Sequence, residues 1–437
     1  MQGLYTSLMR LSAPALRRVL QKRARQGKED PKRLGERMGQ ASVERPAGQL
    51  LWFHAASVGE AQSTLILLEA LHEALPDAHF LITTGTVTSA TLMRKRLPRY
   101  AIHQYYPLDH PDWVRQFLNH WKPNGVIWME SELWPVMLDE IKKRDIPAAL
   151  VNGRLSPQSQ KRWNMAKGMA KSLLSTFGVI MTQTQEDQSA FESLGAARVM
   201  TTDNLKYSAA PLPYDEHELS RLKNAFGDRP LWVYASTHDG EEQLACRLHK
   251  QLKKDVPDIL TIIVPRHPDR REKIKDTLES YDVSYSFRGK ERLVPSTKQD
   301  IYVADTIGEL GLFYHLCPIA CIGRSFSFDG GGGHNPIEAA QHDCAVIHGP
   351  NIQNLALIYD EMNKAGAALM LKDEKMFETR LRKLLTDPEG LSALLRSADI
   401  FLNRKSAVLE RITKTLLPLF AQDTDSQSET VRDVKCA

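Results

Sequence analysis

Short apolar runs alternate with stretches of helical periodicity along most of this chain. Between residues 50 and 182 the apolar runs are Leu50–His54, His79–Thr83, Gly125–Met129, Ala148–Asn152 and Val179–Thr182. Helical patterns such as Ala61–Leu75 and Thr88–Leu97 fill the gaps between them. This alternation of strands and helices predicts a parallel sheet with helices on both faces.

A second series of the same kind follows a proline-bearing segment at residues 208–216. Its apolar runs are Leu231–Ala235, Ile259–Val264, Asp300–Ala304, Pro318–Ile322 and Cys344–His348. Because 437 residues exceed the usual size of one core, the two series predict two doubly wound, Rossmann-like domains that face one another across a cleft. We place these domains at residues 41–210 and 217–400, followed by a helix at 401–420 and a disordered polar tail at 421–437.

The first forty residues differ from the rest of the chain in charge. They carry ten basic side chains against three acidic ones, although the net charge of the whole chain is only +4. Because the excess is local, a nucleic-acid groove across the protein is not expected. Leucines recur among the arginines at near-helical spacing, namely Leu4, Leu8, Leu11, Leu16 and Leu20. This pattern predicts that residues 1–40 form a basic amphipathic segment on a membrane surface; the alternative is a solvated basic helix docked on its own domain.

Composition narrows the classes of site that remain. Apolar residues make up 42% and charged residues 25% of the chain, as in ordinary globular proteins. The five cysteines include no Cys-x-x-Cys pair, so neither a disulfide framework nor a zinc site is indicated, and a reducing compartment is expected. Cys317 and Cys321 lie among apolar neighbours and are predicted to be core residues. The sequence also lacks the usual metal-binding, nucleotide-hydrolase and dinucleotide motifs, so we expect no metal and no cofactor.

A run of four glycines, Gly330–Gly333, leads into His334-Asn335-Pro336-Ile337-Glu338 behind a predicted strand. Glycines let backbone N–H groups approach a ligand, and a helix start favours an anion, so this segment predicts a phosphate contact. The alternative is simple capping, with Asn335 as the N-cap, Pro336 as the first helical residue and Glu338 closing a capping box.

The other polar motifs also follow predicted strands. In the first half they are the turns at residues 54–60 and 128–135, which carry carboxylates. In the second half they are the turns at residues 236–242, 265–268 and 305–309, which offer cations and helix starts. Glu60 and Glu309 each lie three residues after a Ser or Thr and could merely close capping boxes. Their position at the carboxyl edge of a parallel sheet favours ligand binding instead.

Taken together, these turns resemble those of one family. The matching segments are His54-x-x-Ser57-Val58-Gly59-Glu60, Glu130-Ser131-Glu132-Leu133-Trp134-Pro135, Asn152-Gly153-Arg154-Leu155-Ser156, Asn204-Leu205-Lys206-Tyr207, Ser236-Thr237-His238-x-Gly240-Glu241-Glu242, Val264-Pro265-Arg266-His267-Pro268, Asp305-Thr306-x-Gly308-Glu309 and Gly332-Gly333-His334-Asn335-Pro336-x-Glu338. In this order they resemble the 3-deoxy-D-manno-octulosonic acid (Kdo) transferases of Gram-negative bacteria over residues 1–420.

The resemblance implies a GT-B glycosyltransferase with an N-terminal membrane-associated helix. Such an enzyme moves Kdo from CMP-Kdo to a lipid A precursor (lipid IVA) in lipopolysaccharide biosynthesis, with inversion and without a metal. It would work at the cytoplasmic face of the cell inner membrane, with no nucleic-acid partner. The alternatives are a GT-B transferase or epimerase acting on another nucleotide sugar, and a membrane-surface binding protein without catalysis.

The resemblance also assigns roles to residues. Glu60 matches the general base, and Glu130 and Glu132 match an acidic turn that orients the acceptor or the sugar. The residues expected at the CMP-Kdo site are Lys206, Ser236, Thr237, His238, Pro265, Arg266, His267, Ile307, Gly308, Glu309, Gly333, His334, Asn335, Pro336, Ile337 and Glu338.

Three features depart from the family pattern. Asp203 and Arg324 stand where the family usually has glycine, and Ser325-Phe326-Ser327-Phe328-Asp329 precedes a longer glycine run. Asp203 and Arg324 could pair across the predicted cleft, or could change how the donor phosphate is held.

Overall fold

The computed structural model describes residues 2–130, 132–294, 299–327 and 329–420. The predicted disordered tail at 421–437 lies outside these residues. The chain divides into two compact units. Unit 1 contains the chain up to Ala209 together with the helix that follows Ala407, and unit 2 is Ala210–Ser406.

The described residues of unit 1 form a seven-stranded sheet in the order β3-β2-β1-β4-β5-β6-β7, in which all neighbours are parallel. The strands are β1 Leu50–Ala55, β2 His79–Thr84, β3 Ala101–Tyr105, β4 Gly125–Met129, β5 Ala148–Gly153, β6 Val179–Thr182 and β7 Val199–Thr201. The helices are α1 Gln2–Leu11, α2 Ala13–Arg25, α3 Val58–Ala74, α4 Val87–Arg96, α5 Pro111–Trp121, α6 Pro135–Lys143, α7 Pro157–Met165, α8 Lys167–Leu174, α9 Gln185–Ser193 and α18 Val408–Phe420, with short 3-10 turns η1 Pro31–Arg33, η2 Glu36–Met38 and η3 Leu205–Ser208.

Unit 2 repeats this architecture. Its described residues form a second parallel seven-stranded sheet in the order β10-β11-β9-β8-β12-β13-β14. The strands are β8 Leu231–Thr237, β9 Leu260–Pro265, β10 Tyr285–Phe287, β11 Ile301–Val303, β12 Ile319–Ile322, β13 Ala345–His348 and β14 Ala368–Met370. The helices are α10 Glu216–Phe226, α11 Glu241–Leu252, α12 Arg271–Ser280, α13 Leu310–Leu316, α14 Ile337–Ala340, α15 Ala356–Lys364, α16 Glu374–Thr386 and α17 Pro388–Ser406, with 3-10 turns η4 Pro268–Arg270 and η5 Gln353–Leu355.

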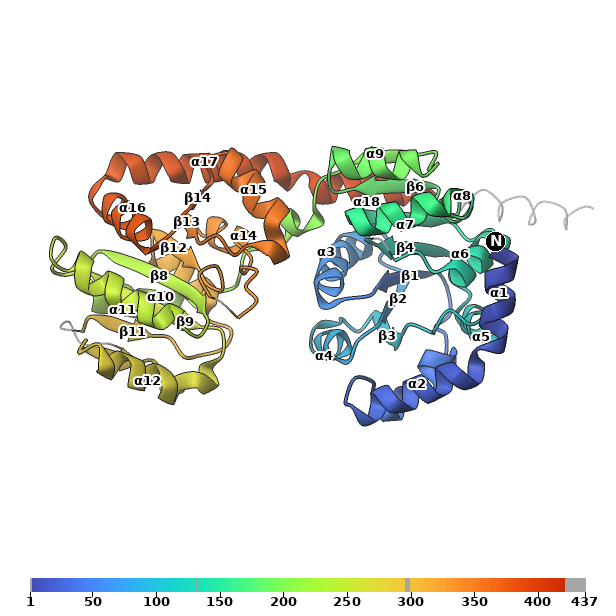
Figure 1. Ribbon diagram of the computed structural model, residues 1–437, viewed down its shortest axis with the longest axis horizontal. Coiled ribbons are helices and arrows are strands. Elements are labelled where there is room, and N and C mark those ends of the chain that lie inside the picture. The colour runs from blue at the N-terminus through green and yellow to red at the C-terminus, as the bar shows by residue number, and fades with distance from the viewer. Residues whose placement is uncertain (1, 131, 295–298, 328, 421–437) are drawn as a thin grey trace, which may run out of the picture. The chain divides into compact units, whose positions relative to one another are not determined.

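Burial on both faces of each sheet explains the continuous apolar strands. In β1, Leu51 and Phe53 pack in a cluster with residues of α3 and α18, whereas Trp52 packs in a second cluster with residues of α5 and α6. Figure 1 shows both sheets with helices packed around them. A strand covered on both faces has no solvent side, so it reads as an unbroken hydrophobic run. The two predicted Rossmann-like folds are therefore confirmed.

The end of the chain differs from the predicted single helix at 401–420. The structure divides this region between α17, which ends at Ser406 in unit 2, and α18, which begins at Val408 in unit 1. Phe420 is 3% exposed, and its carbonyl accepts a hydrogen bond of 2.6 Å from the Gln49 side chain. The last helix thus completes the core of the first unit.

The basic N-terminal segment forms helices α1 and α2. Leu20 is buried and the Tyr5 hydroxyl donates to Asp109 Oδ2 at 3.2 Å, so the segment is docked on its own unit, as the alternative interpretation expected. Leu8, Leu11 and Val19 nevertheless stay 60%, 80% and 50% exposed. Among the described helices, none has the length and apolar character required to cross a bilayer.

Candidate functional site

The acidic group of unit 1 begins at the turn from β1 to α3. Ser57 is the N-cap of α3, and its hydroxyl oxygen accepts from the Glu60 N–H at 3.3 Å. The Glu60 carboxylate turns back and accepts from the Ala56 N–H at 2.8 Å. The predicted capping interaction at Glu60 is therefore present, and it fixes the carboxylate at the carboxyl end of β1.

Burial gives Glu60 a second property. The residue is only 7% exposed, and loss of hydration raises its pKa to about 7, with the charges of Glu130 and Glu132 adding to the increase. A carboxylate of that pKa exchanges its proton near neutral pH, as a general base must. The same side chain therefore serves as a cap and is suited to proton transfer.

Glu130 and Glu132 follow the end of β4. Glu130 has a left-handed backbone (φ 58°), which turns the chain sharply behind the strand. Two tryptophans hold Glu132: Trp128 Nε1 donates to its carbonyl at 2.6 Å and Trp134 Nε1 donates to its carboxylate at 3.1 Å. These contacts hold Glu132, and the charges of Glu130 and Glu132 act on Glu60 in the first turn of α3.

Lys206 brings a positive charge to this acidic group. Its amine lies near Gly59, since a Cβ added at Gly59 would be 3.6 Å from Lys206 Nζ. Partial burial raises the pKa of Glu130, and the positive charges of Lys206 and Arg154 oppose that rise. Lys206, expected at the donor site, is thus placed by its own unit beside the acidic turns.

Asn152, which was not among the predicted site residues, supports the segment that carries this lysine. Asn152 is buried with a left-handed backbone (φ 59°), and its side-chain oxygen accepts from the Leu205 N–H at 3.0 Å. The Asn204 side chain accepts in turn from the Lys206 N–H at 3.0 Å. The resemblance had marked both segments, but only the structure shows that one supports the other.

In unit 2 the turn after β8 is organised by two adjacent carboxylates. Glu242 accepts from the Thr237 hydroxyl at 2.8 Å and from Arg270 at 2.8 Å. Glu241 is fully buried and accepts three backbone N–H groups, from His238 at 2.9 Å, Arg324 at 2.8 Å and Phe326 at 3.0 Å. Glu241 therefore ties the first turn of this unit to the loop after β12.

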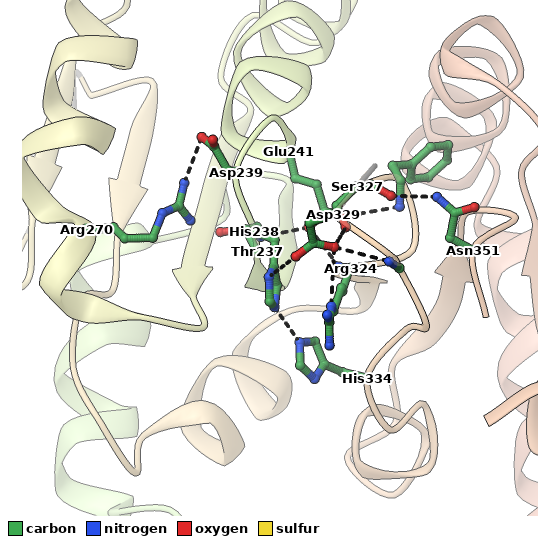
Figure 2. A network of polar contacts seen from close by, with 12 residues as sticks. Thr237, His238, Asp239, Glu241, Arg270, Arg324, Ser327, Asp329, His334 and Asn351 are labelled. Carbon is green, nitrogen blue, oxygen red and sulfur yellow. Dashed lines mark hydrogen bonds and ion pairs between the residues drawn. The ribbon is translucent and has the colours of Figure 1, made fainter. Parts of the chain in front are cut away.

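A group of histidines lies beside this tie, as Figure 2 shows. His238 Nε2 is 3.0 Å from His334 Nε2, and His238 Nδ1 is 3.1 Å from an oxygen of Asp329. The His267 ring centroid is 5.7 Å from that of His238. Burial and, after it, the charge of Arg266 lower the pKa of His334 to about 3. Together with exposed Arg266, these side chains can meet an anion.

Close packing and a positive φ restrict Gly332 and Gly333 of the glycine run. A Cβ on Gly332 would come within 2.1 Å of the Asn354 side chain, and one on Gly333 within 3.0 Å of the Tyr359 ring. Both glycines also have positive φ, of 128° and 65°. This close packing lets the Tyr359 hydroxyl donate to the His334 carbonyl at 2.5 Å and fixes the histidine.

The predicted cap after the glycines is shifted by one residue. The four-residue helix α14 begins at Ile337, so Pro336 rather than Asn335 occupies the N-cap position. The Asn335 side chain accepts from the Ile337 N–H at 3.2 Å and donates to Glu338 at 3.2 Å. Asn335 therefore stabilises the turn before the helix, since the ring of Pro336 disfavours a helical conformation at the residue that precedes it.

Glu309 is held more tightly than a capping box requires. Buried Arg288 donates two hydrogen bonds to its carboxylate, at 2.7 and 2.8 Å, and the Thr306 hydroxyl donates a third at 2.5 Å. The preceding Ile307 is 88% exposed and Gly308 has a positive φ of 87°. Ile307 and Gly308 are thus accessible to a ligand, whereas the Glu309 carboxylate is already engaged.

Asp203 and Arg324, two of the three departures from the family pattern, each have a partner within their own unit. Asp203 pairs with Arg411 at 3.0 Å in unit 1, and Arg324 pairs with Asp329 at 3.4 Å in unit 2. Pro265 ends β9 and leaves Arg266 and His267 exposed at the edge of the sheet.

Within the described residues, no group of three or more His, Cys, Asp or Glu side chains could hold a metal ion.

Comparison with known proteins places these units in a family. A family profile described as 3-Deoxy-D-manno-octulosonic-acid transferase (kdotransferase) matches residues 32–209. A 3-deoxy-D-manno-octulosonic acid transferase of Rickettsia bellii (strain RML369-C) is 32% identical over 90% of this chain and 94% of its own length. One from Rickettsia felis (strain ATCC VR-1525 / URRWXCal2) is 34% identical over 85% of this chain and 79% of its own length.

A solved structure extends the likeness of the fold to both units. A putative UDP-N-acetylglucosamine 2-epimerase from Listeria monocytogenes superposes with a TM-score of 0.56 at 13% identity, over 86% of this chain and 97% of that one. The two-unit architecture is that of GT-B proteins. The chain is therefore a glycosyltransferase that belongs to the 3-deoxy-D-manno-octulosonic acid transferase family.

Proposed function

We propose that this chain transfers Kdo from CMP-Kdo to a lipid A precursor in lipopolysaccharide biosynthesis, with inversion and without a metal. The observation that carries the proposal is Glu60, a buried carboxylate with a pKa of about 7 at the carboxyl end of β1. Membership of the family is the argument for Kdo as the transferred sugar, and Glu60 is the general base that the reaction needs.

The reaction is a single displacement at the anomeric carbon. The acceptor hydroxyl oxygen forms the new bond to carbon while its proton passes to the Glu60 carboxylate. The bond from the anomeric carbon to the phosphate oxygen breaks, and CMP leaves with the electron pair. Attack opposite the leaving group inverts the configuration.

The leaving phosphate needs positive charge or hydrogen-bond donors around it. In unit 2 the candidates are exposed Arg266 and His267, the Ser236–Thr237 turn and the histidines at 238 and 334. These groups can balance the anion without a metal ion. Glu309 would then act by holding the loop that presents Ile307 and Gly308, since Arg288 engages its carboxylate.

The donor can be tested with the purified protein. Thermal unfolding in the presence of CMP, UMP or UDP should show the largest stabilisation by CMP. Transfer from CMP-Kdo to lipid IVA, followed by mass spectrometry of the lipid, should persist in excess EDTA. Stabilisation by UDP without any by CMP would favour another nucleotide sugar, and loss of transfer in EDTA would overturn the metal-free mechanism.

We further propose that α1 and α2 hold the enzyme on the cytoplasmic face of the inner membrane. Exposed Leu8, Leu11 and Val19 lie on a basic helical segment, a combination that favours an anionic lipid surface. Replacing Leu8 and Leu11 by Gln should shift the protein from the pellet to the supernatant after sedimentation with anionic liposomes. Ile400→Gln, at a 54% exposed position of unit 2, is the control that should stay in the pellet. An unchanged pellet fraction in the double variant would refute the proposal.

A further inference from the structure

Asp329 lies in the segment that the family resemblance left unexplained. Its carboxylate accepts from the Ser327 hydroxyl at 2.8 Å and from the Gly331 N–H at 3.2 Å. The same carboxylate contacts Arg324 at 3.4 Å and His238 Nδ1 at 3.1 Å. Figure 2 shows these contacts converging on Asp329. The residue therefore links two of the three departures, Arg324 and the segment before the glycine run, to the histidine pair.

The contact with Asp329 determines where the protons of the histidines lie. A carboxylate only accepts hydrogen bonds, so His238 Nδ1 carries a proton. Neutral His238 then has a bare Nε2, and His334 must donate its Nε2–H across the 3.0 Å between them. Two bare nitrogens would repel at that distance. An additional proton can enter at His334 Nδ1 while the positive charge settles on His238, beside Asp329.

The charges that face this pair come from several loops. Arg266 and His267 follow β9, Arg324 follows β12, and Asp329 directly precedes the glycine run. Burial and the surrounding positive charges lower the pKa values of both histidines, whereas Asp329 raises that of His238. In the free protein the pair is therefore neutral at pH 7. A bound anion would favour the protonated pair.

We propose that Asp329, His238 and His334 form a proton-coupled anion site, in which the pair takes up a proton when the phosphate of the nucleotide binds. Asp329 is the positioning residue, because it keeps the proton on His238 Nδ1 and stabilises the charge. This inference rests on the proposed donor site. It adds a way to balance the second negative charge that the phosphate gains when the sugar leaves.

Isothermal titration calorimetry tests the proposal without turnover. Titrating the full-length protein with CMP at pH 7.5, in buffers of different ionisation enthalpy, gives the number of protons taken up. The methyl ester of CMP is a second probe that lacks the phosphate ionisation near pH 6, so any proton it brings in belongs to the protein. We expect net proton uptake with both probes. Because binding takes up a proton, the affinity should fall as the pH rises, by up to ~10-fold per pH unit if one proton is coupled.

Variants assign the proton to the pair. Asp329→Asn should reduce the uptake, because the charge that stabilises protonated His238 is lost, and His238→Gln should abolish it. The control Asp276→Asn makes the same change at an exposed position of α12 and should match the wild type. Circular dichroism and long-range ¹H–¹⁵N spectra would verify folding and the Nδ1–H tautomer of His238.

The outcomes separate the two proposals. Binding of CMP by the wild type without proton uptake, or equal uptake by Asp329→Asn, overturns the proton-coupled site and leaves the donor site standing. Failure of the wild type to bind either probe overturns the donor site and this inference together.

Discussion

Glu60 and Glu241 occupy matching places in the two units, and their surroundings give them different roles. Each follows the first strand of its unit, β1 or β8, and accepts from a backbone N–H of the turn behind that strand, at 2.8 and 2.9 Å. The strands β1 and β8 are alike as well, since Trp52 of β1 and Trp232 of β8 each donate to a threonine of the adjacent strand at 2.9 Å.

The difference lies in what else each carboxylate meets. Glu241 is fully buried and accepts two further N–H groups from the loop after β12, whereas Glu60 lies near other carboxylates. Burial raises the pKa of Glu241 as well, but its three backbone donors oppose that rise and make the residue a structural tie. Burial, together with the negative charges of Glu130 and Glu132, raises the pKa of Glu60 to about 7 and makes it a group that can hold a proton. The same fold position thus serves structure in one unit and chemistry in the other.

The largest expected effect is on catalysis. Glu60→Gln keeps an oxygen that can accept from Ala56 N–H but removes the base, so kcat for Kdo transfer should fall by ~10²–10⁴-fold. Steady-state assays with CMP-Kdo and lipid IVA would measure it, and CMP affinity should stay unchanged. A variant with near-normal kcat would remove Glu60 from the mechanism.

The matching substitution in unit 2 should act on stability. Glu241→Ala leaves three partly buried N–H groups without their acceptor, and each costs ~1 kcal/mol or more, so the free energy of unfolding should fall by about 3 kcal/mol. Urea denaturation would measure this, with exposed Glu272→Ala of α12 as the control. A loss no greater than that of the control would refute the role of Glu241 as a tie.

Glu60 should itself reduce stability as the pH rises. Its pKa is raised by folding from 4.5 to about 7, so the folded state holds this proton more tightly than the unfolded state. The cost of ionising Glu60 therefore grows between pH 4.5 and 7 and then stays constant. Glu60→Gln should gain stability over the wild type across that range, by up to ~3 kcal/mol at pH 8. Urea denaturation of both proteins at pH 5 and pH 8 would measure this. If Glu60→Gln and the wild type differ in free energy of unfolding by the same amount at both pH values, the prediction is contradicted.

The smallest effect is expected at Asp203. Asp203→Gly removes a partly exposed ion pair with Arg411, worth less than ~1 kcal/mol, and relieves a left-handed backbone of φ 70°. The two changes oppose one another, so Tm should move little in a thermal melt. A large loss of stability would show that this family departure carries more of the unit 1 structure than its ion pair.

The apolar strands could be predicted from sequence because burial on both faces leaves a continuous signal. Gly125–Met129 and Val179–Thr182 match β4 and β6 residue for residue. The strand Ala101–Tyr105 was not predicted, because His103 and Gln104 interrupt its pattern. The three-residue strands β7, β10 and β14 were not predicted because they are too short to show a pattern, whereas β11, equally short, lies within the predicted run Asp300–Ala304.

The candidate site, too, has parts that the sequence predicts and parts that it does not. The turns could be located because polar motifs directly follow buried strands, and the Ser57–Glu60 cap is local in sequence. Glu241 reaches residues more than eighty positions away, and Asp329 meets His238 across 91, so no spacing rule reveals these contacts. The role of each carboxylate depends on such distant partners, which only the folded chain brings together.

The pH dependence of Kdo transfer tests the central claim most directly. If Glu60 takes the acceptor's proton, kcat of the wild type should rise with pH through a midpoint near the raised pKa of about 7 and then level off. Glu60→Gln should show low activity without that rise. A wild-type profile that is flat between pH 5.5 and 8.5, or a rise that persists unchanged in Glu60→Gln, would contradict the assignment of Glu60 as the base.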